Sequence, residues 1–125
     1  MFTPNASLSS FSVDDLGAAR TFYSETLGLP LADGVMGSLE ITLPEGTKVM
    51  VYPKDNHEPA TFTILNFVVD DVDTAVDQLN EAGVKTDLYD DPGLPTDAKG
   101  IMRGNGPDIA WFKDPAGNVL SALKP

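Results

Sequence analysis

The residues of this sequence that could take part in chemistry are few. The only histidine, His57, occurs in the stretch "YPKDNHEPATF" at 52–62, which has the composition of a loop. An imidazole at the mouth of a cleft could act as a general base, because it gains and loses a proton near neutral pH. The alternative is an exposed loop histidine that hydrogen-bonds to a neighbour. "His57-Glu58" lacks the second histidine of a zinc-protease helix, so that motif is absent.

A second candidate is Arg103, in the stretch "KGIMRGNGPDIAW" at 99–111. Its guanidinium could bind a carboxylate or a phosphate through two parallel hydrogen bonds. The alternative is a surface ion pair with Asp108 or Asp97. The only tryptophan, Trp111, could stack on a ligand, although a lone tryptophan in a small domain usually belongs to the core or to a dimer interface.

Two pairs of adjacent aspartates stand in nearly identical surroundings, "FSVDDL" at 11–16 and "FVVDDV" at 67–72. Apolar residues at helical spacing follow each pair. Asp15 and Asp71 therefore occupy the position that precedes a helix, where a carboxylate accepts hydrogen bonds from free backbone N–H groups. The pairs indicate helix caps rather than metal ligands or acid–base catalysts.

The repeated motif predicts two similar halves. Each half opens with a strand, at 7–13 or 62–68, and continues with a helix that ends at a glycine, Gly28 or Gly83. Three short strands are expected after each helix, so that each half is βαβββ. The predicted ranges are 29–32, 39–43 and 48–52 in the first half and 84–88, 108–113 and 119–123 in the second, with 99–104 as either an edge strand or a loop.

A half of this size cannot bury its sheet alone. We therefore expect a single α+β domain over residues 1–125. It consists of a first βαβββ module at 7–52, a linker loop at 53–61 and a second module at 62–123.

Composition and charge exclude several classes of function. Of 125 residues, 19 are acidic and 8 are basic, and the net charge is −11. Such a field repels a polyanion, so a nucleic-acid partner is not expected. No apolar run is long enough to span a bilayer, and the N-terminus lacks the features of a secretory signal. The chain has no cysteine, which excludes thiolate chemistry and is compatible with the cytoplasm. We therefore expect a cytoplasmic protein without a membrane partner.

Three stretches that occur in register are "SVDDLGAARTFYSETLGL" at 12–29, "VDDVDTAVDQLNEAGV" at 69–84 and "IAWFKDPAGNVLSAL" at 109–123. They resemble the vicinal oxygen chelate superfamily, which includes glyoxalase I, extradiol dioxygenases and bleomycin-resistance proteins. The resemblance covers almost the whole chain. It implies the glyoxalase/bleomycin resistance fold, in which two βαβββ modules curl their sheets into a shared cleft, and it implies a homodimer.

Enzymes of this superfamily hold a divalent metal with His or Glu side chains from the first and last strand of each module. The resemblance places these positions at Leu8, at Met50 or Val51, at Ile64 and at Ser121. None of these side chains is such a ligand, and the surrounding strand segments contain no His, Glu or Asp. We therefore expect no metal and no other cofactor.

Side chains alternate between the two faces of a strand. The face on which the superfamily places its ligands carries Ser10 and Ser12 in the first module and Asn66 in the second. Hydroxyl and amide groups among aliphatic side chains can orient a small organic molecule. The alternative is a filled core in which they only satisfy backbone groups. The ligand-binding residues that we predict are Ser10, Ser12, Asn66, Met102, Arg103 and Trp111.

Three functions are compatible with these observations. The first is a binding protein that sequesters a small organic ligand, as bleomycin-resistance proteins do. The acidic charge is compatible with a cationic ligand, and the alternative is that it serves solubility alone. The second is a metal-independent lyase, isomerase or hydrolase that uses His57, Arg103 and a serine. The third is a metal-dependent glyoxalase or dioxygenase with displaced ligands, which the missing ligand side chains oppose. We favour the binding protein over an enzyme.

Overall fold

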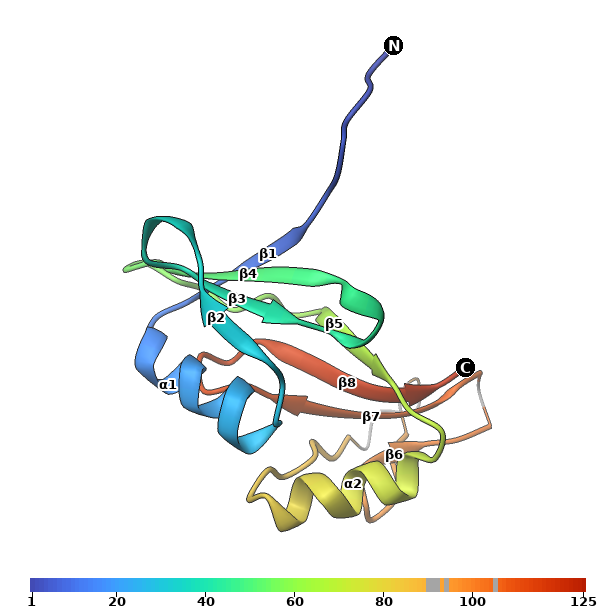
Figure 1. Ribbon diagram of the computed structural model, residues 1–125. Coiled ribbons are helices and arrows are strands. Elements are labelled where there is room, and N and C mark those ends of the chain that lie inside the picture. The colour runs from blue at the N-terminus through green and yellow to red at the C-terminus, as the bar shows by residue number, and fades with distance from the viewer. Residues whose placement is uncertain (90–92, 94, 105) are drawn as a thin grey trace. The chain divides into compact units, whose positions relative to one another are not determined.

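The computed structural model forms two compact units, Met1–Glu58 and Pro59–Pro125 (Figure 1). The residues that the structure describes are 1–89, 93, 95–104 and 106–125. Each unit contains a four-stranded mixed sheet and a helix, so the predicted α+β class and the two βαβββ modules are confirmed. The boundary between the units falls inside the predicted linker. No helix within the described ranges is long and apolar enough to cross a membrane.

The sheet of the first unit has the strand order β1-β4-β3-β2. Its strands are β1 Ser9–Val13, β2 Leu31–Asp33, β3 Leu39–Thr42 and β4 Lys48–Pro53. The first and last strands, β1 and β4, are parallel neighbours, and the other pairs are antiparallel. The predicted strands of this half are thus confirmed to within two residues at each end.

The helix of the first unit begins with α1, Leu16–Arg20, and continues as a π-helical segment, Thr21–Thr26. Asp15 caps its start, because its Oδ1 accepts the N–H of Ala18 at 3.0 Å. Gly28 follows its end with a φ of +73°, a conformation that favours glycine. Both predicted helix boundaries are therefore correct, although the wider π turn was not predicted.

Tyr23 joins this helix to the sheet. The side chain is fully buried, and its ring centroid lies 5.8 Å from that of Phe11 on β1 and 5.1 Å from that of Phe22. Phe11 therefore faces the helix. Ser10 and Ser12 alternate with it along β1 and belong to the opposite face, which we call the first helix-free face. The other buried residues of the core are Val13, Ala19, Leu39, Ile41, Val49 and Val51.

The second unit repeats this topology with the strand order β5-β8-β7-β6. Its strands are β5 Thr63–Val68, β6 Ile101–Met102, β7 Asp108–Lys113 and β8 Val119–Lys124, and its helix is α2, Val72–Glu81. Asp71 caps α2 by accepting the N–H of Asp73 at 3.1 Å, and Gly83 follows the helix with a φ of +88°. The repeat therefore uses the same boundary signals twice.

The predicted strand at 84–88 is not a strand in the structure. The edge of the second sheet is instead formed by β6, which lies within 99–104 and pairs with Ile109 and Ala110 of β7. The segment 84–88 contacts β7 further along, where the N–H of Asp87 donates to the carbonyl oxygen of Trp111 at 2.8 Å. Both segments have strand-like sequences, and β6 occupies the edge position.

A cluster of Val72, Val76, Ile101 and Ala110 forms the core of the second unit, and Val69 packs against it. Because α2 packs against β7 and β8, these residues define the helix-covered face. Side chains alternate between the two faces of a strand, so the strand neighbours of these residues belong to the opposite face. We call it the second helix-free face, and it includes Met102, Trp111 and Ser121.

The predicted turn at 114–117, between β7 and β8, depends on a buried carboxylate. Asp114 is 5% exposed; its Oδ1 accepts the N–H groups of Ala116 and Asn118, and its Oδ2 accepts the side-chain amide of Asn118, each at 2.9 Å. These hydrogen bonds hold the tight connection between the two central strands of the sheet.

Replacing Asp114 with alanine should lower the free energy of unfolding by about 3 kcal/mol, because three hydrogen bonds are lost and buried donors are left without acceptors. Urea unfolding measures the change. The control is Asp70→Ala on the exposed surface, which should change stability by less than about 0.5 kcal/mol. Equal effects of the two substitutions would contradict the assigned role of Asp114.

Candidate ligand-binding faces of the two sheets

The first helix-free face presents polar groups in two rows across the sheet. In one row Ser10 lies opposite Met50, which lies opposite Glu40; in the other Ser12 lies opposite Tyr52. Ser10 is exposed, and the other four side chains are half-buried. Hydroxyl, carboxylate, thioether and phenol groups are therefore available on one surface for contacts with a small molecule.

His57 lies beside the predicted serine Ser12. The distance between Ser12 Oγ and His57 Nδ1 is 2.6 Å. The loop after β4 is held in place because the N–H of Lys54 donates to the carbonyl oxygen of Val13 at 2.9 Å and the N–H of His57 donates to that of Lys54 at 3.0 Å. The imidazole thus hydrogen-bonds to a neighbour, and that neighbour belongs to the first helix-free face.

The second helix-free face carries a row in which Asn66, Ser121 and Trp111 lie opposite one another on three strands. Ser121 Oγ donates to Asn66 Oδ1 at 2.5 Å, and Trp111 Nε1 donates to Thr63 Oγ1 at 3.1 Å. Ser121 is fully buried and Trp111 is 9% exposed, whereas Asn66 is exposed. Met102 lies opposite Ile109 on the same face.

Tyr89 was not among the predicted residues, although it packs against Trp111. Their ring centroids are 5.6 Å apart at an interplanar angle of 88°. Burial raises the pKa of the Tyr89 hydroxyl, and the negative charge of Asp87, whose carboxylate accepts the hydroxyl at 3.5 Å, raises it further. Nothing local in the sequence indicates this pair, because it depends on where the segment after α2 meets β7.

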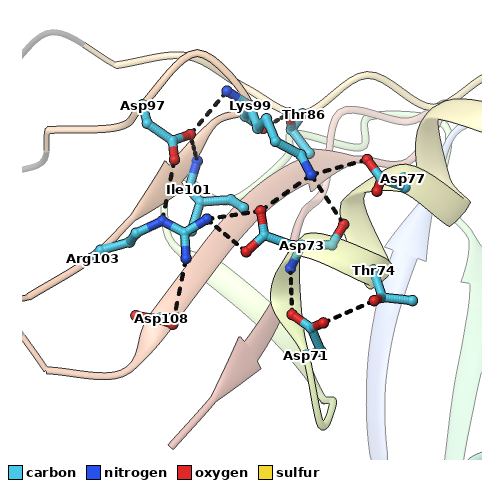
Figure 2. A network of polar contacts seen from close by, with 10 residues as sticks. All are labelled: Asp71, Asp73, Thr74, Asp77, Thr86, Asp97, Lys99, Ile101, Arg103 and Asp108. Atoms are coloured by element: carbon cyan, nitrogen blue, oxygen red, sulfur yellow. Dashed lines mark hydrogen bonds and ion pairs between the residues drawn. The ribbon is translucent and has the colours of Figure 1, made fainter.

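Arg103 is the centre of an ion-pair network (Figure 2). Its guanidinium contacts Asp73 of α2 at 2.8 Å, Asp97 at 3.2 Å and Asp108 of β7 at 3.8 Å. Lys99 contacts Asp73 at 3.2 Å as well. The pairs with Asp97 and Asp108 are the alternative considered from sequence, and Asp73 was not anticipated. A ligand carboxylate at Arg103 would have to compete with these three acids, so a role in binding stays a prediction.

The network lowers the pKa of two carboxyl groups. Hydrogen bonds from Arg103 and Lys99 hold the pKa of Asp73 below its ordinary value of 3.8. Burial raises the pKa of Asp97, but hydrogen bonds from the backbone N–H groups of Ile101 and Lys99 and from Arg103 outweigh burial, so the pKa of Asp97 is also lowered. Both carboxylates therefore stabilise the folded state while they are ionised.

The positions at which the superfamily holds a metal do not fit a metal ion. The resemblance assigns these positions to Leu8, Met50 or Val51, Ile64 and Ser121, none of which offers an imidazole or a carboxylate. In the described part of the chain, no group of three or more His, Asp or Glu side chains is arranged to hold an ion.

Two depressions of about 410 Å³ each lie on the second unit. One is lined by residues that follow α2, including Lys85 and Thr86, and by Lys99. The other is lined in part by Tyr89 and Thr96. Neither is lined by a residue that we predicted to bind the ligand.

The chain matches the family model of the Glyoxalase/Bleomycin resistance protein/Dioxygenase superfamily over residues 8–121. It belongs to this superfamily, as its motifs indicated. Comparison with curated proteins gave no match.

Solved structures with the same fold include proteins linked to antibiotics. TnmS3, an antibiotic binding protein from Streptomyces sp. CB03234, is 29% identical, with 99% of each chain covered and a TM-score of 0.72. A glyoxalase/bleomycin resistance protein from the same strain is 30% identical, with 94% of this chain and 100% of that chain covered and a TM-score of 0.66. The fosfomycin resistance protein FosX from Listeria monocytogenes shares the fold at 12% identity, with 99% and 95% covered and a TM-score of 0.73.

Asp73→Asn should destabilise the protein at neutral pH, and much less at an acidic pH below the lowered pKa that Asp73 has in the folded state. The pKa of Asp73 is lowered in the folded state, so its contribution to stability is present above the ordinary value and is lost as the pH falls through the folded value. Urea unfolding at the two pH values measures the difference. In the matched control Asp55→Asn, an exposed loop carboxylate is removed, and we expect the same small change at both pH values. A destabilisation by Asp73→Asn that does not depend on pH would contradict the electrostatic account.

Proposed function

We propose that the chain is a small-molecule-binding protein that sequesters an organic ligand through side chains of its helix-free faces, without a metal. On the first face we assign ligand contacts to Ser10 and Ser12, and on the second face to Asn66, Met102 and Trp111, each face being considered by itself. Arg103 is also assigned to the ligand, in a secondary role, because its guanidinium is held by Asp73 of the covering helix and by Asp97 and Asp108.

The observation that carries the proposal is the chemistry of the positions where related enzymes bind their metal. Leucine, methionine or valine, isoleucine and serine stand there, and they leave the chain without the Lewis acid on which that catalysis depends. What the helix-free faces offer instead is a set of hydroxyl, amide, thioether and indole groups. Such groups can orient and bury an organic molecule.

The charge of the chain supports a cationic ligand. A net charge of −11 on 125 residues gives the surface a negative potential that attracts cations. Glu40 lies opposite Met50 on the first helix-free face and places a carboxylate there. Its partner Lys48, at 3.1 Å, offsets part of this charge.

Similarity to an antibiotic binding protein supports the same class of function. TnmS3 is 29% identical over nearly the full length of both chains. We infer that the ligand of this chain is a natural product of comparable character, and that the protein confers resistance by removing it from solution. We also propose that the chain forms a homodimer, which the resemblance implies.

The proposal predicts that a ligand raises thermal stability and that a single hydroxyl on the first face matters for affinity. At a concentration of about 100 times Kd, a ligand that binds only the folded state adds about 2.7 kcal/mol. Thermal unfolding with a panel of aromatic amines, each paired with a neutral analogue, should show larger shifts for the amines. Ser10→Val should weaken binding of the best amine about tenfold, because the hydroxyl that contacts the ligand is replaced by a larger apolar side chain.

Ser9→Val is the matched control. Ser9 is exposed, and it lies next to Ser10 on the same strand but on the other face. This substitution should leave the affinity unchanged. Equal losses of affinity from the two substitutions would overturn the assignment of the binding face. Larger thermal shifts with the neutral analogues than with the amines would overturn the assignment of the ligand class.

A further inference from the structure

A second chemical capability follows from the contact between Ser12 and His57. The two residues are far apart in the sequence, and the 2.6 Å distance between Oγ and Nδ1 is that of a strong hydrogen bond. In the tautomer that carries its proton on Nε2, Nδ1 accepts the hydroxyl hydrogen of Ser12. A hydroxyl hydrogen-bonded to an imidazole is the first element of an activated serine nucleophile.

The contact is fixed by the backbone on both sides. Ser12 is the penultimate residue of β1, paired with Tyr52 of β4. Just after β4 the chain turns back through Lys54, whose N–H donates to the carbonyl oxygen of Val13 and whose carbonyl oxygen accepts the N–H of His57. The Nζ of Lys54 also donates to Asn56 Oδ1 at 2.8 Å. The imidazole is thus held against the strand by this turn.

Accessibility distinguishes this pair from a core contact. Ser12 and His57 are both half-buried, so each residue keeps part of its surface exposed to solvent while the rest is shielded from water. Ser12 also belongs to the first helix-free face, where the neighbouring side chains are available to a bound molecule. Both properties are required of a nucleophile that reacts with a substrate.

We propose that Ser12 is an acyl acceptor that His57 activates, and that its substrates are small carboxylic esters with a good leaving group. Ser12 Oγ attacks the ester carbonyl and forms a new C–O bond, while the hydroxyl proton moves to His57 Nδ1. The bond between the carbonyl carbon and the leaving oxygen then breaks, and His57 returns the proton to that oxygen. The products are an acylated Ser12 and the free alcohol or phenol.

This inference goes beyond the proposed function, which requires no covalent step. A binding protein with an acylatable serine could attach itself to a ligand that carries an activated ester. Failure of the acylation would leave the binding proposal intact, because the contacts that we assign to the ligand do not depend on it.

The test uses 4-nitrophenyl acetate as the probe and the full-length protein. Release of 4-nitrophenolate is followed by absorbance, and peptide mass spectrometry locates the acetyl group. We expect acetylation at Ser12 in preference to Ser9 and Ser10, which lie on the same strand and serve as internal references. His57→Gln keeps a hydrogen-bonding side chain but cannot take up the proton, so the rate of Ser12 acetylation should fall about a hundredfold.

Ser12→Ala should abolish the fast phase of 4-nitrophenolate release, whereas Ser9→Ala should leave it unchanged. Acetyl groups found only on lysines and the N-terminus would overturn the proposal, as would equal labelling of the three serines in the wild-type protein. An unchanged rate of Ser12 acetylation in His57→Gln would likewise show that the imidazole is not the base. The comparison among serines needs no variant, so it holds even if a substitution disturbs folding.

Discussion

In each unit the first and last strands are parallel neighbours, β1 with β4 and β5 with β8. Parallel neighbours cannot be joined by a tight turn, so the chain must leave the sheet and return. The helix lies in this connection and covers one face. Tyr23 in the first unit, and Val72 and Val76 in the second, bury that face. The other face of each sheet is not covered by the unit's own helix. Every residue that we assign to a ligand lies on such a face, with the exception of Arg103.

Much of this arrangement could be predicted from local sequence. Asp15 and Asp71 cap the helices because a carboxylate at that position satisfies free N–H groups, and alternation along β1 separates Ser10 and Ser12 from Phe11. The strand at 84–88 was wrong, because the choice between this segment and Ile101–Met102 for the sheet edge depends on long-range pairing with β7. The ion pair of Asp73 with Arg103 was not predicted for the same reason, because the two residues are brought together only when α2 packs on the sheet.

The candidate sites differ from those of metal-binding enzymes of the superfamily in the side chains at the metal-ligand positions. A hydrophobic or hydroxyl side chain stands at each position that the resemblance assigns to a metal ligand, and one of them, Ser121, donates a hydrogen bond to Asn66. Under the proposed function, binding depends on polar contacts and aromatic surface and not on a Lewis acid. The Ser12–His57 pair uses only side chains of the protein, so it is compatible with this replacement. The proposed binding and the proposed acylation are therefore separate, although both use residues of β1.

Native mass spectrometry of the purified full-length protein, without added metal or chelator, tests the central claim of metal-free ligand binding most directly. The account predicts a dimer without a stoichiometric divalent metal; a co-purified ligand would add organic mass, lost when the protein is denatured. A stoichiometric divalent metal, retained through purification, would contradict it and would point to a metal-dependent enzyme with displaced ligands.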